Sequence, residues 1–175
     1  LGRHPMNNAA VAVQTIEILR KKGYRISDRD LRAGLKKAKW PGRFEIVNHS
    51  PVVVIDGAHN VEGTKALADN LKSYYPHKKI TFVCGVLADK DYREMMKPLF
   101  PLAYRFAAVT PESNRALSAE TLASFLNSYH SNVMTGGTIR DTISHCLNTA
   151  SREEVICVFG SLYYIGEVRE YFGLA

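Results

Sequence analysis

The sequence predicts an α/β domain built on a mostly parallel sheet, preceded by a short helical segment. From about residue 44 onward, stretches with strand character alternate with stretches that have helical periodicity. Two strand-like stretches, VVVI and VICVF, are continuous apolar runs rich in β-branched residues, which is typical of strands covered on both faces. Because helices separate these strands, we expect parallel pairing through right-handed crossovers.

The chain is expected to open with a helix over residues 8–22. Apolar side chains recur there at helical spacing, and two asparagines precede them. Either Asn7 or Asn8 suits the N-terminal end of this helix, and Gly23 is expected to end it after a pair of lysines.

A second helix is expected over residues 28–38. Ser27 or Asp28 would begin it, and it must end before Pro41, because the residue before a proline avoids helical geometry. The pattern changes at about residues 40–42, so we expect a domain boundary there, with residues 1–40 and 41–175 forming separate parts.

The remaining chain contains the alternating elements of the predicted sheet. The candidate strands are Phe44–Val47, Val52–Asp56, Ile80–Gly85, Phe106–Thr110, Asn132–Thr135 and Val155–Gly160. The candidate helices cover residues 62–74, 91–98, 118–129, 138–150 and 162–172. The first strand, FEIV, departs from the buried pattern of the others and could be an antiparallel edge strand.

The composition is that of a soluble globular protein, with 46% hydrophobic and 23% charged residues. No apolar run is long enough to cross a membrane, and no signal peptide is recognisable. The chain begins with leucine, so we expect it to be a fragment of a longer protein. Its three cysteines lie in apolar segments without metal-site spacing, which suggests buried, reduced thiols and a cytoplasmic location.

The net charge of +6 comes largely from basic residues between Arg20 and Arg43. Such a region could attract nucleic acid, a nucleotide or a polyanionic substrate, or it could be a solvated helix face. The absence of nucleic-acid recognition motifs argues against a nucleic-acid partner.

Polar or glycine-containing segments follow the predicted strands, where open parallel sheets bind their ligands. The most distinctive is DGAHN, residues 56–60, directly after a buried strand. Asp56 could accept hydrogen bonds from ribose hydroxyls, and His59 could bind a substrate carboxylate or titrate near neutrality. Alternatively, Asp56 or Asn60 could simply cap the helix that follows.

Two further segments after strands are candidates for binding anions. Gly160 and Ser161 are expected to open a helix, whose N-terminal backbone donors would suit a carboxylate or phosphate, although Ser161 could be an ordinary helix cap. Arg115 offers a planar guanidinium for a carboxylate but could also be a surface residue. The tyrosines Tyr163 and Tyr164 fall inside this expected helix and would be core or interface residues.

Several motifs are absent, including the phosphate-binding loop, the dinucleotide fingerprint and the nucleophile elbow. A free-standing kinase, dehydrogenase or hydrolase is therefore disfavoured.

Taken together, the motifs have a familiar order. They are GRHPMNNAAVA, WPGRFE, VVVIDGAHN, DKD, TPESNRA and VFGSLYYIGEVR. In this order they resemble folylpolyglutamate synthases, which belong to the ATP-dependent Mur ligase superfamily. The resemblance implies a Rossmann-like three-layer sandwich with a six-stranded, mostly parallel sheet that contains one antiparallel strand. It also implies that residues 1–40 are the last helices of an ATPase domain and that residues 41–175 form the C-terminal glutamate-binding domain.

The implied reaction joins L-glutamate to the γ-carboxylate of a reduced folate. ATP activates that carboxylate as an acyl phosphate, and the amine of glutamate attacks it. The resemblance assigns Asn8 to the nucleotide base, Arg43 to the ATP phosphates and Asp56 to the ribose side of ATP. Ligands for Mg²⁺ are expected in the ATPase domain, outside this chain.

The glutamate side of the implied site falls to His59 and Ser161, which with Arg43 and Asp56 complete the expected catalytic set. Arg115 matches a segment that recognises the incoming amino acid in related Mur ligases. Pro5 and Val61 depart from the common form of their motifs, but neither position carries a side chain that these roles need.

Two alternatives to this function stay open. One is another Mur-type ligase that adds an amino acid to a cell-wall precursor, although DGAHN and GSLYYIGEVR favour the folate branch. The other is a noncatalytic nucleotide-binding module. This chain alone is expected to be inactive, because the resemblance assigns the ATPase domain to a region outside it.

Overall fold

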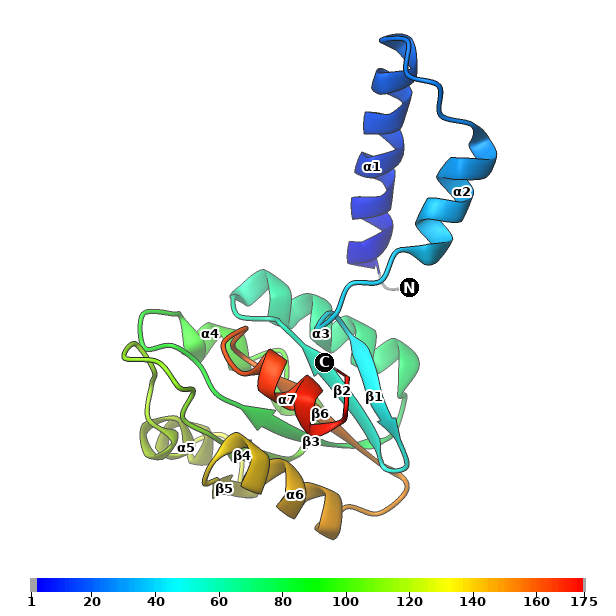
Figure 1. Cartoon of the computed structure of the whole chain (residues 1–175). Coiled ribbons are helices and arrows are strands. Elements are labelled where there is room, and N and C mark those ends of the chain that lie inside the picture. The colour runs from blue at the N-terminus through cyan, green and yellow to red at the C-terminus, as the bar shows by residue number, and fades with distance from the viewer. Residues whose placement is uncertain (1–2, 175) are drawn as a thin grey trace. The chain divides into compact units, whose positions relative to one another are not determined.

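The computed structural model of the chain describes residues 3–174, with side chains from residue 8 onward (Figure 1). The chain forms two compact units, Leu1–Pro41 and Gly42–Ala175.

The first unit contains helices α1, Arg3–Lys21, and α2, Asp28–Lys37. Helix α1 begins earlier than expected, so Asn7 and Asn8 lie within it and the prediction that one of them caps it is wrong. Pro5 falls in the first turn, where a proline is tolerated because its missing N–H would have no helical partner. Gly23 follows the helix with a φ of +92°, as expected of a glycine after a helix end.

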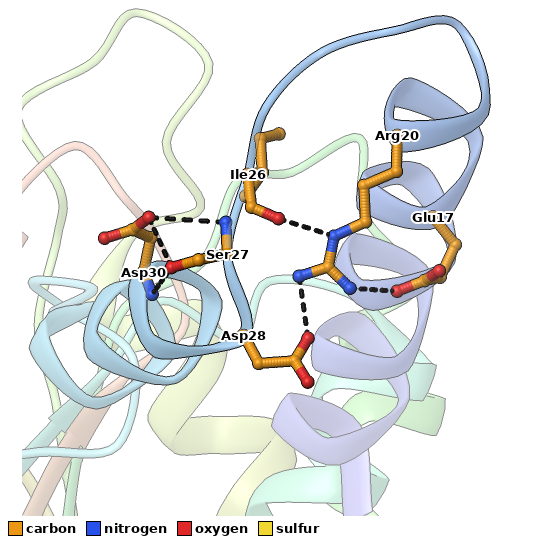
Figure 2. Close-up of polar contacts among 6 residues, drawn as sticks. All are labelled: Glu17, Arg20, Ile26, Ser27, Asp28 and Asp30. Carbon is orange, nitrogen blue, oxygen red and sulfur yellow. Dashed lines mark hydrogen bonds and ion pairs between the residues drawn. The ribbon is translucent and has the colours of Figure 1, made fainter.

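Helix α2 begins at a capping box, which confirms Ser27 as its N-cap. The backbone N–H of Asp30 donates to Ser27 Oγ at 3.1 Å, and the backbone N–H of Ser27 donates to Asp30 Oδ2 at 3.3 Å. The Ser27 hydroxyl also donates to Asp30 Oδ2 at 2.6 Å, and this bond, with the one from the Ser27 N–H, holds the pKa of the exposed Asp30 carboxyl below its ordinary value. Figure 2 shows the box beside the connection between the helices.

Arg20 ties the α1–α2 connection together (Figure 2). Its Nε donates to the carbonyl of Ile26 at 2.8 Å, and its Nη1 donates to Glu17 at 2.7 Å. The Nη2 atom lies 2.8 Å from Asp28 Oδ1 as an ion pair rather than a directed hydrogen bond. One guanidinium therefore joins the end of α1, the connecting loop and the first residue of α2.

The second unit is built on a six-stranded sheet with strand order β1-β2-β6-β3-β4-β5. The strands are β1 Glu45–His49, β2 Val52–Asp56, β3 Lys79–Cys84, β4 Ala103–Ala108, β5 Val133–Thr135 and β6 Glu154–Phe159. Only β1 pairs in antiparallel fashion, with β2, and the other neighbours are parallel. The predicted mostly parallel sheet with one antiparallel edge strand is confirmed.

Helices cover both faces of this sheet (Figure 1). They are α3 Val61–Tyr74, α4 Tyr92–Met96, α5 Ala119–Asn127, α6 Ile139–Thr149 and α7 Ile165–Tyr171, with a short 3₁₀ turn at Phe100–Leu102. Alternate side chains of β2 enter separate cores: Val54 joins α3, α4 and α5, whereas Val53 and Ile55 join α6 and α7. The three-layer arrangement follows from this alternation.

In the second unit, two elements have a boundary that differs from the sequence prediction by three residues, whereas the others differ by at most two. Strand β4 covers Ala103–Ala108 rather than Phe106–Thr110, because its first half carries half-exposed or exposed side chains that hide the strand pattern. Helix α7 begins at Ile165 rather than at residue 162, so residues 161–164 form a turn instead of the start of a helix.

The three cysteines are free and buried. Burial raises the pKa of the Cys84 thiol from 9.0 to about 12, and burial also raises the pKa values of Cys146 and Cys157. No helix in the described part of the chain combines the length and apolar character needed to span a bilayer.

We expect alkaline pH to destabilise this unit through its thiols. Above pH 9 the Cys84 thiol ionises in the unfolded chain, but in the folded chain it stays protonated until about pH 12. The unfolded state then binds fewer protons, so the free energy of unfolding falls as pH rises through this range. Urea unfolding at pH 8 and pH 10.5 should show a larger loss for the wild type than for Cys84→Ala. Equal losses would contradict the assignment to Cys84.

Candidate active site

The carboxyl ends of β2, β6 and β3 form a switch point in the sheet. Strand β6 lies between the other two and leads to α7 on one face, whereas β2 and β3 lead to α3 and α4 on the other. Connections that leave neighbouring strands toward opposite faces open a crevice where α/β sheets bind ligands. The turns after β2 and β6 touch there, because the N–H of Gly160 donates to the carbonyl of Ala58 at 3.0 Å.

A buried tyrosine joins the ends of β3 and β6. The Tyr164 hydroxyl accepts a hydrogen bond from the N–H of Gly85 at 3.0 Å and donates to the carbonyl of Phe159. Tyr164 is 2% exposed and is a core residue, whereas Tyr163 is 59% exposed and is not. Burial raises the pKa of the Tyr164 hydroxyl well above its ordinary value, so it remains a protonated donor.

Asp56 organises the turn after β2. Its Oδ1 accepts from the N–H of Ala58 at 2.7 Å, and its Oδ2 accepts from the N–H of Phe44 at 2.8 Å. The residue as a whole is 9% exposed. Asp56 is therefore not the cap of helix α3; Asn60 is, because its Oδ1 accepts from the N–H of Gly63 at 2.7 Å.

The loop before β1 is held from several sides. The N–H of Gly42 donates to Glu45 Oε2 at 2.7 Å, and the carbonyl of Gly42 accepts from the N–H of Gly57 at 2.7 Å. Glu45 also pairs with Arg169 of α7. Phe44 has a φ of +43°, a left-handed conformation that surrounding contacts must support.

This loop presents Arg43 beside the DGAHN turn. Arg43 is exposed, and its Nη1 lies 3.2 Å from the point that a Cβ atom on Gly57 would occupy. The Cδ2 atom of Leu162 would lie 2.4 Å from the same Cβ atom, so a larger residue at position 57 would require the Leu162 side chain to move. The structure thus brings Arg43 and the turn that carries Asp56 and His59 together.

His59 is oriented by the backbone of its own turn. Its Nδ1 lies 2.8 Å from the carbonyl oxygen of Gly57. A carbonyl can only accept, so Nδ1 carries the proton, and in the neutral ring Nε2 is left as an acceptor. His59 is partly exposed, which leaves Nε2 suited to contact a ligand.

Ser161 follows β6 but does not begin a helix. Its side chain is 2% exposed, and its Oγ accepts from the N–H of Tyr163 at 3.2 Å. Both sequence interpretations of a helix N-terminus at Ser161, as an anion site or as a simple cap, are wrong, because α7 starts at Ile165. Ser161 instead belongs to a tight turn whose neighbour, Gly160, has a φ of +116°.

Arg115 lies in the loop after β4, where it pairs with Asp89 from the loop after β3. The side chain of Asp91, in the DKD segment, accepts from the N–H of Glu94 at 3.2 Å and caps α4. Asn8 lies exposed on α1, in the first unit. Among the side chains that the structure describes, from residue 8 to residue 174, no three of the His, Cys, Asp and Glu residues are grouped so as to hold a metal ion.

Residues 42–162 match the family described as "Mur ligase, glutamate ligase domain". The chain belongs to the Mur ligase family. Its Mur ligase relatives include the dihydrofolate synthase/folylpolyglutamate synthase of Bacillus subtilis, which is 36% identical over 97% of this chain. The chain spans 39% of that relative's length.

Solved structures of folylpolyglutamate synthases share this fold. The Mycobacterium tuberculosis folylpolyglutamate synthase complexed with ADP has a TM-score of 0.86 and 29% identity, over 98% of this chain and 40% of that one. A bifunctional folylpolyglutamate synthase/dihydrofolate synthase with Mn, AMPPNP and L-glutamate bound has a TM-score of 0.80 and 26% identity. That match covers 91% of this chain and 38% of the other.

Sequence reasoning missed three features of this edge: the Tyr164 hydroxyl, the Glu45–Arg169 support and the Asp89–Arg115 pair. Each joins residues far apart in the chain, with separations of 79, 124 and 26 residues. No local pattern could have indicated these contacts, although GSLYY and DKD marked the segments that make them.

Proposed function

We propose that this chain is the glutamate-binding part of an ATP-dependent folylpolyglutamate synthase, which joins L-glutamate to the γ-carboxylate of a reduced folate. The observation that carries this proposal is the meeting of the Arg43 loop, the DGAHN turn and the Gly160–Ser161 turn at one switch point. The names of the relatives support it, since they include folylpolyglutamate synthases with ADP, AMPPNP or L-glutamate bound.

ATP is the proposed cofactor, and when bound it supplies activation of the folate carboxylate as an acyl phosphate. The exposed guanidinium of Arg43 fits a phosphate, because it is permanently charged and can donate two parallel hydrogen bonds. Asp56 holds the loop that carries Arg43, because its carboxylate accepts from the N–H of Phe44. The same carboxylate is proposed to lie on the ribose side of the bound ATP. Asn8 would contact the base from the first unit.

Glutamate is proposed to bind beside His59, Ser161 and Arg115. The Nε2 atom of His59 is an acceptor in the neutral ring and suits the ammonium or amine of the substrate. Ser161 offers a hydroxyl, and Arg115 offers a guanidinium for a carboxylate. Closure around these groups would exclude water, which could otherwise hydrolyse an acyl phosphate.

The remaining parts of the machinery are proposed to come from an ATPase domain, which would carry the phosphate-binding loop and the Mg²⁺ ligands. Residues 1–40 would be the last helices of that domain, and residues 41–175 the glutamate-binding domain. The buried free thiols favour a cytoplasmic enzyme.

The test is phosphate release by the complete enzyme that contains this chain. We expect turnover only when ATP, reduced folate and L-glutamate are all present. Dihydropteroate in place of the reduced folate would reveal a second, dihydrofolate synthase activity. Turnover with a cell-wall precursor but not with folate would replace the proposal by another Mur-type ligase, and binding of ATP without any turnover would favour a noncatalytic module.

Within this function, His59→Ala and Ser161→Ala should act on glutamate rather than on ATP. Each removes a group proposed to contact the amino acid, so we expect the KM for glutamate to rise about tenfold, the effect of one lost hydrogen bond to a charged group. The KM for ATP should stay within twofold of the wild type, measured at saturating folate and glutamate. A larger effect on ATP than on glutamate would overturn the assignment.

A further inference from the structure

Three loops, each following a different strand, bring polar side chains together at Arg115. Arg115 itself comes from the loop after β4, Asp89 from the loop after β3, and Tyr163 from the turn after β6. Arg115 forms an ion pair with Asp89, and the hydroxyl of Tyr163 is near enough to add to the raised pKa of Arg115, which Asp89 mainly causes.

The backbone fixes where the pair can form. The N–H of Ala88 donates to the carbonyl of Arg115 at 2.8 Å, and the N–H of Leu117 donates to the carbonyl of Val86 at 2.9 Å. Leu87 and Ala116 form an antiparallel bridge between these bonds. The two loops are thus joined as a short ribbon, which holds the backbones of the two ion-pair residues at a set spacing.

The side chains themselves are open to solvent. Those of Arg115 and Asp89 are 50% and 48% exposed, so water competes with the pair and its net strength is small. The hydrogen bond from Arg115 holds the pKa of Asp89 below its ordinary value, so the carboxylate is charged at neutral pH. Asp89 contacts the guanidinium through one oxygen, Oδ2, on Nη2. A carboxylate group on a ligand offers Arg115 the same kind of charged acceptor and can engage the guanidinium through both of its oxygens.

We propose that Asp89 is an exchangeable counter-ion for Arg115, which the side-chain carboxylate of the incoming acidic amino acid replaces. The inference rests on the proposed function and adds a specificity-determining residue to it. An amino acid with a neutral side chain cannot replace Asp89, so Arg115 stays paired and contributes nothing to its binding. An acidic amino acid gains the Arg115 contact but must first displace Asp89.

The experiment uses the complete enzyme and the Asp89→Asn variant. Asparagine keeps the size of the side chain but removes the charge, so Arg115 no longer needs to exchange one carboxylate for another. We expect the KM for L-glutamate to fall by about two- to fivefold, which corresponds to the strength of an exposed ion pair. The KM for ATP should not change.

Two controls separate this exchange from other effects. Glu112→Gln removes the same charge from an exposed position on the loop that carries Arg115 and should leave the KM for glutamate unchanged. In an Arg115→Ala background, Asp89→Asn should have no further effect, because the group released by the substitution is gone. Thermal unfolding midpoints equal to the wild type show that the variants are folded.

Several outcomes would overturn the inference. A rise in the KM for glutamate in Asp89→Asn would show that Asp89 positions Arg115 for the substrate rather than competing with the substrate for it. An unchanged KM would show that Asp89 has no role in glutamate binding. An equal fall in the KM for glutamate in Glu112→Gln would show that the effect comes from the overall surface charge and not from the Asp89–Arg115 pair. If the wild type shows no glutamate-dependent phosphate release, the proposed function fails, which is a separate result from any of these.

Discussion

Replacing Gly160 with alanine is expected to destabilise the second unit by about 3 kcal/mol, from backbone strain of 1–3 kcal/mol together with a steric clash. Gly160 has a φ of +116°, which alanine rarely adopts. An added Cβ atom would lie 2.5 Å from the carbonyl oxygen of Gly85, a backbone atom that cannot rotate away. The turns after β6 and β3 would have to separate, so we also expect the loss of glutamate-dependent turnover.

Gly166→Ala is the matched control for this substitution. Gly166 lies inside helix α7, with nothing within 4 Å of its added Cβ atom. Alanine there should leave the domain unchanged or stabilise it by roughly 0.5–1 kcal/mol, because alanine favours helix more than glycine does. Urea unfolding of both variants measures the difference, and a Gly160→Ala protein as stable as the wild type would show that the turn adapts freely.

Asp56→Ala is expected to reduce kcat/KM for ATP about 100-fold, the effect expected when a binding group is displaced by about an ångström. Without the carboxylate, the N–H groups of Phe44 and Ala58 lose their acceptor. Phe44 has a left-handed backbone conformation that depends on such support, so the loop that presents Arg43 should relax.

A double-mutant cycle with Arg43→Ala tests this explanation. If Asp56 acts through the position of Arg43, kcat/KM for ATP of the double variant should be no lower than that of the less active single variant. Losses that multiply would mean that Asp56 contacts ATP independently, as a direct ribose contact requires. Asp56→Asn provides a further comparison, because it keeps one acceptor oxygen and should preserve one of the two backbone contacts.

Much of the fold could be predicted because its strands are strongly patterned. Val52–Asp56 and the core of the last strand, within VICVF, stand out as apolar runs, and burial on both faces of the sheet explains why. Strand β4 was displaced in the prediction because Tyr104 and Arg105 do not have the character of a buried strand. Helix α7 was made too long because the apolar turn before it has a helical composition, whereas the Tyr164 hydroxyl bonds hold that turn in place.

The site was predictable only at the level of segments. That parallel strands end on one edge is a rule of topology, so the meeting of the DGAHN and Gly160–Ser161 turns could be anticipated. Which side chains touch depends on loop conformations set by contacts distant in sequence, such as Asp89 with Arg115. The roles of Arg43, His59 and Ser161 remain predictions that the proposed kinetic measurements address.

The boundary between the two compact units falls directly before Gly42, whose N–H and carbonyl are both bonded within the second unit. The loop that carries Arg43 is therefore anchored from its first residue by bonds internal to the second unit. The register between the guanidinium of Arg43 and the DGAHN turn is set by the second unit's own backbone and needs no contribution from the residues that precede Gly42.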